Sequence, residues 1–326
     1  MDADSSAPGD PYPFAPNKGA AIFFTTAFAC SGLFHAFQFY HYKCLKLTIL
    51  LPICCAIEVA GLATRTYGAI HPDDAQTYTA STLLINLAPP AFQLANFLIL
   101  GRLFHFIPYF APMHPNRMFV TFASMTFIIE LLTATGVAFL SNPSLPLKDL
   151  QRGDSMAKAA LVLQILVFCL FSLLAGILHR CCYTGSIDSP LVRRPLGALY
   201  ASFALILART IYRLVEQFNT PLGPRPADPA VLHPAVRYEW YFYVFDASLM
   251  LLNSVLWNVL HPRRYLPENP VWYLAQDGKT QVKGPGWKDT RSLTETFMDP
   301  FAALTARGGH TRPFWEHNGY KLKRRR

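Results

Sequence analysis

Two apolar stretches of the sequence each carry three polar residues at helical spacing. They are Arg209, Arg213 and Glu216 in the first stretch, and Glu239, Tyr243 and Asp246 in the second. Residues spaced i, i+4 and i+7 share one face of a helix, so each set predicts a polar stripe. Counting about 1.5 Å per residue along each stretch puts Arg209 and Asp246 at the same depth. We therefore predict an Arg209–Asp246 ion pair between two facing stripes, which line a polar strip open toward the outer leaflet of a membrane.

A third apolar stretch has amides on one face and two prolines between them. Asn86, Gln93 and Asn96 share that face, and Pro89 and Pro90 stand in the middle of it. Proline has no amide hydrogen, so this pair should break the backbone ladder and free carbonyl groups. A kink of this kind in a membrane helix often accompanies a binding cavity.

Two further carboxylates fall near the middle of other apolar stretches. Glu58 and Glu130 have no obvious partner in the sequence, and an intramembrane carboxylate is a functional candidate by default. Carboxylates pair with a cationic amine, whereas arginines hold such carboxylates in place or contact a phosphate. The predicted substrate-binding residues are Glu58, Gln93, Asn96, Glu130, Arg209, Arg213, Glu216, Glu239, Tyr243 and Asp246. The alternative is that these groups only fasten helices together.

The elements that must position these residues follow from composition. Of 326 residues, 52% are hydrophobic and 15% are charged, whereas an ordinary soluble domain is about a quarter charged. Seven apolar stretches have the length of about 20 residues that a helix needs to cross a bilayer. They are Ala20–Tyr40, Leu47–Thr64, Ser81–Leu100, Met118–Leu140, Ala157–Leu178, Leu196–Leu214 and Trp240–Leu260. The sequence therefore predicts an all-α, polytopic membrane protein with seven transmembrane helices.

The distribution of positive charge sets the predicted orientation. Seven spans put the termini on opposite sides, and residues 263–326 contain 13 Lys/Arg against six Asp/Glu. A polybasic end such as Lys321–Arg326 is attracted to an anionic cytoplasmic leaflet. We therefore expect residues 1–19 to be a short extracellular tail, residues 20–262 the seven-helix domain, and residues 263–326 a basic, largely disordered cytoplasmic tail. Gly278–Trp287 and Arg307–Arg312 in particular read as disordered.

Motifs for soluble chemistry are absent from the sequence. It has no Walker sequence, no glycine-rich nucleotide loop, no His-x-x-Glu-His metal site and no Gly-x-Ser-x-Gly elbow. We therefore expect no cofactor, no metal and no nucleic-acid partner. We also expect that the protein is not an enzyme, with an integral-membrane lipid or terpenoid enzyme as the open alternative. None of the seven cysteines forms a pair on the predicted outer side, so a disulfide framework is not expected.

Several motifs resemble the fungal lipid-translocating exporter family, a group of seven-span membrane proteins. The resemblance covers about residues 20–267 and is most specific at Arg209-Thr-Ile-Tyr-Arg213-Leu-Val-Glu216, Glu239-Trp-Tyr-Phe-Tyr-Val-Phe-Asp246 and His261-Pro262. Glu58-Val-Ala-Gly61-Leu-Ala-Thr-Arg65 and the segment from Ala88 to Arg102 are similar to the family's second and third helices. The family includes a sphingoid long-chain-base exporter and an aminocholesterol-resistance protein. The resemblance implies a plasma-membrane protein, or one of the vacuolar or another endomembrane, that moves amphipaths or confers resistance to them.

Three functional hypotheses follow, and membrane lipids or amphipathic small molecules are the expected partners. The leading one is an exporter or floppase for amphipaths such as sphingoid bases. The second is a seven-helix lipid receptor or sensor that docks a partner on its basic tail. The third is an integral-membrane enzyme that uses Glu58, Glu130 or Asp246 as a general acid. The sequence does not predict an oligomeric state.

Overall fold

A computed structural model describes residues 17–43, 45–71, 74–142, 145–222, 231–267, 269–275, 277–284 and 292–299. Within these ranges seven helices are long and apolar enough to cross a membrane, as the sequence predicts. They run Lys18–Tyr42, Leu50–Gly68, Gln76–Phe106, Pro115–Leu140, Leu147–Thr184, Pro190–Asn219 and Trp240–Arg264. The all-α, seven-span fold is therefore confirmed. The polybasic end at 321–326 and the segment at 307–312 lie outside the described residues.

Helices account for nearly all of the described chain. The long helices are α1 (Lys18–Tyr42), α3 (Leu50–Gly68), α4 (Ala75–Phe106), α5 (Pro115–Leu140), α6 (Leu147–Thr184), α7 (Pro190–Asn219) and α10 (Ser248–Val259). The short ones are α2 (Leu45–Thr48), η1 (Pro108–Phe110), α8 (Pro234–Arg237), α9 (Trp240–Phe242), η3 (Tyr243–Ala247), η4 (Pro262–Arg264) and α11 (Leu293–Met298). Strands β1 (Trp272–Leu274) and β2 (Gln281–Lys283) pair antiparallel, with Tyr273 opposite Val282.

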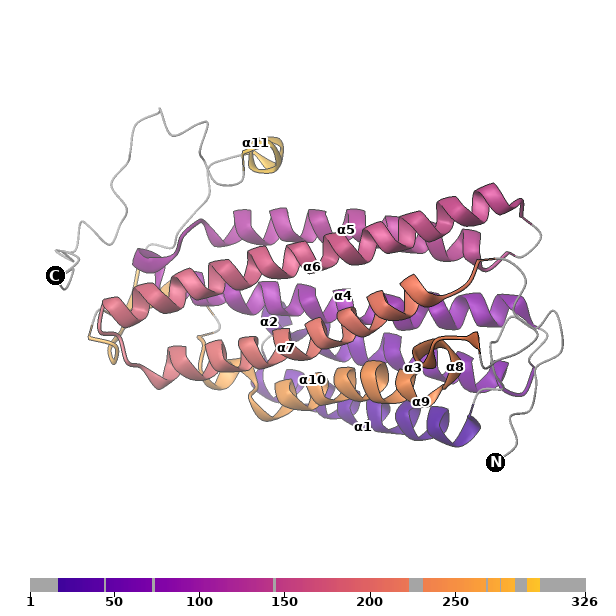
Figure 1. Cartoon of the computed structure of the whole chain (residues 1–326). Helices are drawn as coiled ribbons and strands as arrows, with labels where there is room; N and C mark the ends of the chain where they lie inside the picture. The colour runs from indigo at the N-terminus through magenta and orange to yellow at the C-terminus, as the bar shows by residue number, and fades with distance from the viewer. Residues whose placement is uncertain are drawn as a thin grey trace.

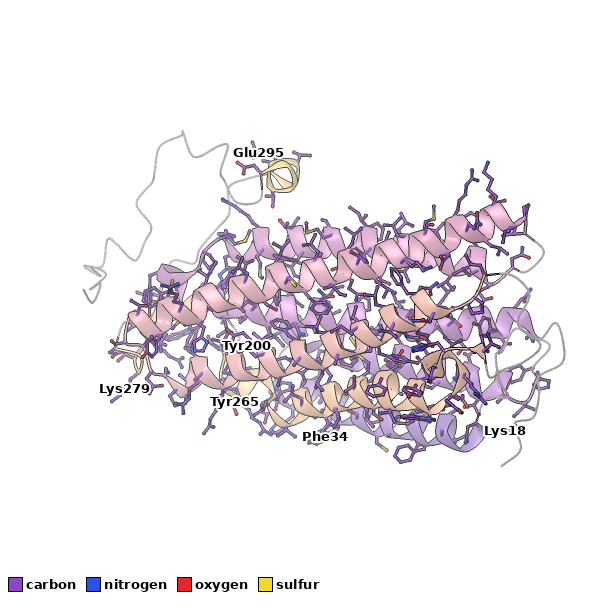
Figure 2. All side chains as sticks on the ribbon, in the orientation of Figure 1. Lys18, Phe34, Tyr200, Tyr265, Lys279 and Glu295 are labelled. Atoms are coloured by element: carbon purple, nitrogen blue, oxygen red, sulfur yellow. The ribbon has the colours of Figure 1, made fainter. Side chains whose placement is uncertain are left out.

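The long helices form one elongated bundle (Figure 1). Neighbours in the chain pack side by side from α3 to α7, and α10 closes the ring by packing on both α7 and α1. Helix α4 also contacts α7 across the ring. Of the 18-residue window that defines the α4 span, 61% is buried, against 17% for α5, so α4 is the central helix. Lys18 and Lys279 mark opposite ends of the bundle in Figure 2.

Side-chain caps fix where two of these helices begin. The Asn17 side chain accepts a hydrogen bond from the Ala20 amide at the start of α1. Asp74 accepts hydrogen bonds from the Thr77 hydroxyl and from the Gln76 and Thr77 amides at the start of α4. These bonds, led by that of the Thr77 hydroxyl, hold the pKa of Asp74 below its usual range. Such caps satisfy amides that have no partner within the helix.

Helix α6 begins earlier than the sequence indicates. The predicted span starts at Ala157, whereas α6 starts at Leu147, next to Pro146. This first part contains charged and polar residues such as Lys148, Asp149 and Arg152, so a search for apolar stretches does not include it. Such residues suit an exposed helix end. The consequence is that Asp154, which the sequence places in a loop, is a buried helical residue.

Four phenylalanines from four helices form the apolar centre on one side of the bundle. Phe97 of α4 lies 4.5 Å from Phe171 of α6 and 5.3 Å from Phe122 of α5, measured between ring centroids. Phe171 also meets Phe203 of α7 edge to face at 4.9 Å. Rings at these separations attract each other beyond the burial of their surface. This cluster holds α4 to α7 together as one unit.

Glycines let α5 and α6 approach closely. A Cβ added at Gly153 would lie 2.6 Å from the Phe139 Cβ and 3.0 Å from the Gly136 carbonyl oxygen. No neighbour lies within 4 Å of the position that a Cβ would take at Gly176, farther along the same helix. Small residues at helix crossings are how membrane helices reach close contact.

Part of the segment expected to be disordered is folded against the bundle. Leu266, Tyr273 and Leu274 are buried, and the Tyr109 hydroxyl donates to the Leu274 carbonyl at 3.0 Å. Gly278 lies in the turn of the hairpin with a φ of 70°, which suits glycine. The expectation of disorder at Gly278–Trp287 is therefore wrong for residues 278–284, because apolar residues before the turn anchor the hairpin.

We expect Gly153→Ala to lower the free energy of unfolding by about 1–3 kcal/mol, because the added methyl overpacks the α5–α6 contact. Gly176→Ala should be neutral or slightly stabilising, since alanine favours a helix by up to about 1 kcal/mol and meets no neighbour. Thermal unfolding of the purified protein in detergent measures both. Equal midpoints for the two variants would contradict the close approach.

Candidate functional site

Asp246 lies between two arginines of α7. Its Oδ1 accepts a hydrogen bond from the Nε of Arg209 at 2.9 Å, and its Oδ2 lies 2.5 Å from the Nε of Arg213. The second contact is an ion pair by distance, while its geometry falls outside that of a hydrogen bond. The side chains of Arg209 and Asp246 are 2% and 1% exposed. The predicted Arg209–Asp246 pair is therefore present, and Arg213 joins it.

The same α7 stripe contains Glu216, which stays on its own helix. Its carboxylate accepts from Arg213 Nη1 at 2.7 Å and from the Tyr212 hydroxyl at 3.2 Å. Arg213 thus lies between two carboxylates, Asp246 across the helix interface and Glu216 one turn along. This alternation balances charge along the stripe.

The Ile85 carbonyl of α4, which a proline leaves without its helical hydrogen bond, is a further acceptor for Arg209. The Nη2 of Arg209 donates to the Ile85 carbonyl at 3.4 Å and to the Asn86 Oδ1 at 3.3 Å. Pro89 stands four residues after Ile85 and has no amide hydrogen to donate to that carbonyl. Helix α4 continues through both prolines. The Ile85 carbonyl, which Pro89 leaves without its ladder partner, faces the arginine as the proline pair predicts.

Asp246 is presented by a π-helical turn. Residues Tyr243–Ala247 form η3 between α9 and α10, and the Ser248 hydroxyl donates to the Tyr243 carbonyl at 2.8 Å. The wider turn inserts one residue into the helix and changes which side chains face α7. The predicted stripe through Glu239, Tyr243 and Asp246 depends on a regular α-helix, whereas the backbone is π-helical from Tyr243 to Ala247.

Glu239 pairs with α3 rather than with α7. Its Oε1 accepts from Arg65 Nη2 at 2.9 Å, and its Oε2 accepts from the Asn17 amide at 2.7 Å. The Arg65 guanidinium carbon lies 4.4 Å from the centre of the Phe242 ring, and that of Arg213 lies 5.5 Å from it. Phe242 therefore links the two ion groups through cation–π contacts. Tyr243 packs beside them and donates to the Asn17 carbonyl at 3.3 Å.

Sequence reasoning did not include Arg65 among the site residues. Glu58 and Arg65 are seven residues apart in one helix, which places them on the same face. That spacing was a usable signal. Arg65 lies near the end of its helix, where basic residues normally face the membrane–water interface, so this spacing did not single it out.

Glu58 lies beside the ion groups without an arginine in contact among the described residues. Its side chain is 1% exposed, and its Oε1 has no hydrogen-bond partner among the described protein atoms. Asp246, Arg209 and Arg213 are the charged groups that act on it electrostatically. The ion groups contain three arginines, while Glu58, Asp246, Glu216 and Glu239 make four carboxylates. The site thus has one carboxylate in excess.

The remaining predicted residues are not joined to the arginines by direct contacts. Asn96 and Ser202 exchange two hydrogen bonds of 2.8 and 3.2 Å, which fasten α4 to α7. Gln93 is buried, and its Nε2 has no partner among the described atoms. Glu130 is half-buried on α5, and Arg209 is the charged group that acts on it.

A second polar group, around Asp154, was also missed. Asp154 is buried on α6, accepts from Lys158 Nζ at 2.6 Å and from Gln217 Nε2 of α7 at 3.0 Å. Its position became clear only with the early start of α6. In the described ranges no group of three His, Cys, Asp or Glu is arranged to hold a metal ion.

We expect Asp246→Asn to destabilise the protein more than Arg209→Gln. Loss of Asp246 leaves two arginines without the carboxylate between them, whereas loss of Arg209 leaves Asp246 paired with Arg213. Breaking a buried pair costs about 3–5 kcal/mol, and we expect that range for Asp246→Asn. Arg152→Gln, which removes an exposed pair with Asp149, should change stability by less than about 1 kcal/mol. Thermal unfolding in detergent ranks the three variants, and an inverted order would contradict the arrangement.

Several curated proteins are similar to this chain over most of its length. A Leptosphaeria maculans protein named "Lipid-translocating exporter-like protein RTA1" is 41% identical over 300 residues, which are 88% of this chain and 57% of that protein. A protein of the same name from Ajellomyces capsulatus is 30% identical, covering 78% of this chain and 81% of the relative. "Probable lipid transporter atnI" of Emericella nidulans is 25% identical, covering 79% and 69%. This chain spans little more than half the length of the Leptosphaeria relative.

The family assignment rests on the region that contains the site. No solved structure matches the chain. The model of the family described as "RTA1 like protein" matches residues 51–269, which include Glu58, both arginines of α7 and Asp246. With this match and the two relatives at 30% identity or more, the chain belongs to the RTA1-like family of fungal membrane proteins.

Proposed function

We propose that this protein exports or flops amphipathic lipids across its membrane, and that sphingoid long-chain bases belong to its substrates. The names of the relatives, which include lipid-translocating exporter-like proteins and a probable lipid transporter, support the general class. The observation that carries the proposal is the excess carboxylate, Glu58, which is buried beside an otherwise neutralised ion cluster.

A sphingoid base carries the cationic hydrogen-bond donor that the Glu58 carboxylate lacks as a partner. Its primary amine is a cation that donates hydrogen bonds, and Glu58 Oε1 is an acceptor without a donor. Arg209 and Arg213 are already engaged by Asp246, so they hold the carboxylates in place rather than compete for the amine. The acyl chain of the substrate can stay in lipid while the amine reaches Glu58.

The substrate reaches Glu58 through a conformational change. Glu58 is 1% exposed, and α1, α3 and α10 pack together on its side of the bundle. A bound cation would satisfy the orphan oxygen and favour the conformation in which these helices separate. Transporters commonly expose a mid-membrane site alternately to the two sides in this way.

The orientation follows from charge. We infer an extracellular N-terminus and a cytoplasmic C-terminus, with residues 263–326 drawn to the anionic leaflet by their basic residues. In this inferred orientation the Arg65–Glu239 pair lies near the outer surface and the hairpin of β1 and β2 lies on the inner side. We propose the plasma membrane as the location of the protein.

The test is movement of fluorescent sphingosine labelled on its tail between the leaflets of proteoliposomes, followed by extraction with albumin. We expect Glu58→Gln to reduce the protein-dependent rate by about tenfold, because a lost charge-assisted contact of about 1.4 kcal/mol corresponds to that factor. Asp149→Asn, which alters a partly exposed carboxylate at the start of α6, should leave the rate unchanged.

A matched substrate separates recognition of the amine from general damage. The N-acetylated base has no cation, so the wild type and Glu58→Gln should move it at the same rate. Equal rates of the two proteins toward sphingosine itself would disprove the role of Glu58. If no amphipath moves and sphingosine instead promotes binding of a cytoplasmic partner, the protein is a receptor, and a product of changed mass would indicate an enzyme.

A further inference from the structure

Seven buried polar atoms without partners lie on one side of the bundle. They are His35 Nδ1, Gln38 Oε1, Glu58 Oε1, Asn253 Nδ2, Asn253 Oδ1, Trp257 Nε1 and Asn258 Oδ1, none with a hydrogen-bond partner among the described protein atoms. Their residues are at most 6% exposed, and Asn253 and Trp257 are 0% exposed. Polar groups buried in a protein are nearly always hydrogen-bonded, so a concentration of exceptions demands a physical cause.

These residues form a continuous row across half of the bundle. On the seventh span, Asn253, Trp257 and Asn258 follow Asp246 along the buried face at helical spacing. On α1, His35 and Gln38 lie one turn apart on the buried face. Helix α10 packs on α1, and α3, which carries Glu58, packs on α1 as well. The row therefore starts at the excess carboxylate and runs toward the other end of the bundle.

Hydrogen bonds between the three helices connect His35, Gln38 and Asn258 of this row through Ser31 and Ser254, and Cys55 joins from α3. Ser254 Oγ lies 2.6 Å from Ser31 Oγ, 3.1 Å from Cys55 Sγ and 3.2 Å from His35 Nε2. Asn258 Nδ2 donates to Ser31 Oγ at 2.7 Å, and the Gln38 amide donates to the Asn258 carbonyl at 2.8 Å. Cys55 is one helical turn before Glu58, about 4.5 Å along α3. His35, Gln38 and Asn258 each have a further polar atom that no described protein group satisfies.

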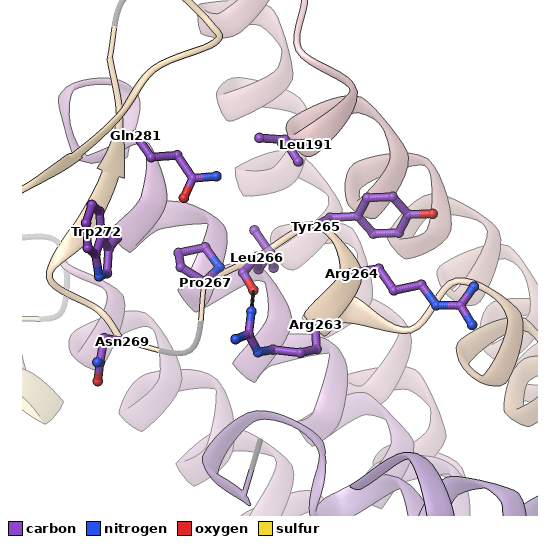
Figure 3. A pocket seen from close by; sticks show the side chains of 9 residues that line it. All are labelled: Leu191, Arg263, Arg264, Tyr265, Leu266, Pro267, Asn269, Trp272 and Gln281. Carbon is purple, nitrogen blue, oxygen red and sulfur yellow. Dashed lines mark hydrogen bonds between the residues drawn. The ribbon is translucent and has the colours of Figure 1, made fainter. Parts of the chain in front are cut away.

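The far end of the row approaches an open cleft. His261 follows α10, stacks on Tyr42 at 4.9 Å and accepts from the Arg263 amide. Arg263, Arg264, Asn269 and Gln281 are among the residues that line a cleft of about 350 Å³ directly after it (Figure 3). Arg263 Nη1 donates to the Leu266 carbonyl there. In the chain, only residues 259–262 separate Asn258 of the row from Arg263 of this cleft.

We propose that the row holds a file of water molecules that carries protons between Glu58 and the cleft at residues 263–281. Water can accept a hydrogen bond from the orphan N–H groups of the row and donate one to its orphan oxygen atoms, and buried water typically makes about three hydrogen bonds to such groups. One proton leaves the Glu58 carboxyl group for the first water, each water passes one proton onward, and the last releases one into the cleft. Glu58 is left as a carboxylate, and the reverse sequence restores the acid.

The surroundings of Glu58 fit this exchange. The charged groups that face it are Arg209 and Arg213 of α7 and Asp246 of η3, and on its own helix Cys54 and Cys55 are the titratable neighbours. From α1 the row contributes His35, which His261 influences in turn. Glu58 can take up a proton when no cationic substrate is bound and lose it when the amine arrives. The proton path rests on the proposed export function, because the proton is the ion that is exchanged for the cationic substrate.

Proton movement can be measured separately from lipid movement. Proteoliposomes with a trapped pH-sensitive dye receive a potassium diffusion potential, with and without sphingosine, and proton uptake is recorded. We expect wild-type uptake above that of empty liposomes in at least one condition. Asn253→Leu and Glu58→Gln should lower it by about tenfold, since an apolar side chain excludes water from a narrow file and the amide carries no exchangeable acid proton.

The control is Thr126→Val, which removes a buried hydroxyl that also lacks a partner but lies on α5. It should retain wild-type uptake. All variants must first elute as monodisperse protein with an unfolding midpoint that shows they are folded. Absence of uptake in the wild type, or normal uptake in Asn253→Leu, would overturn the proton path; normal lipid movement alongside would leave the export function intact.

Hydroxyl-radical footprinting of the wild type tests the water itself. Met250 lies on the buried face of α10 that carries Asn253, whereas Met118 lies in the first turn of α5, and both are 0% exposed. Radicals form from water, so Met250 should oxidise several-fold faster than Met118 if the row is hydrated. Equal oxidation of the two methionines would overturn the hydrated file whatever the transport assays show.

Discussion

The buried carboxylate of Asp246, held between Arg209 and Arg213, is the interaction on which the rest of the structure depends. Three charges removed from water are stable together only if each finds partners, because the desolvation of an unpaired ion exceeds what packing can return. The helices that meet at this point are therefore not free to slide or rotate. The positions of α4, α7 and the last span are set by this charge compensation.

Several irregular features serve that compensation. The π-helical turn of η3 points Asp246 toward α7, and Pro89 leaves the Ile85 carbonyl for Arg209. Close packing of α3 on α4 supports the same point, since a Cβ at Gly61 would lie 2.8 Å from the Ile85 side chain. In a membrane, irregular backbone is tolerated only where other protein groups satisfy it. Here each irregularity supplies a group that the ion cluster uses.

The sequence predicts the fold well because the bilayer imposes a strong rule. Length and apolarity locate all seven spans, and helical spacing with matched depth finds the Arg209–Asp246 pair. The same reasoning fails where the backbone departs from a regular α-helix or a span from strict apolarity. A π-helical turn has no reliable sequence signal, so the pairing of Glu239 with Arg65 of α3 was not predicted. Because the first residues of α6 are polar, the buried position of Asp154 in this helix was likewise not predicted. The hairpin was missed because anchoring by Leu266 and Tyr273 depends on the helix ends they meet.

Asp246 and Glu58 divide two tasks that one carboxylate cannot perform together. A carboxylate clamped by two guanidiniums keeps its charge compensated in every state, which makes it a fixed point for the helices and a poor binding group. Glu58 sits in the field of the same ions but contacts neither arginine. In the function we propose, its charge is compensated by a mobile partner, either a proton or a cationic amine. Exchange of these two partners on one oxygen couples them, because the group cannot hold both at once. The fixed ion cluster thus sets the position of Glu58. In the proposed proton path, the polar row between α1, α3 and α10 gives the proton of Glu58 a route to solvent.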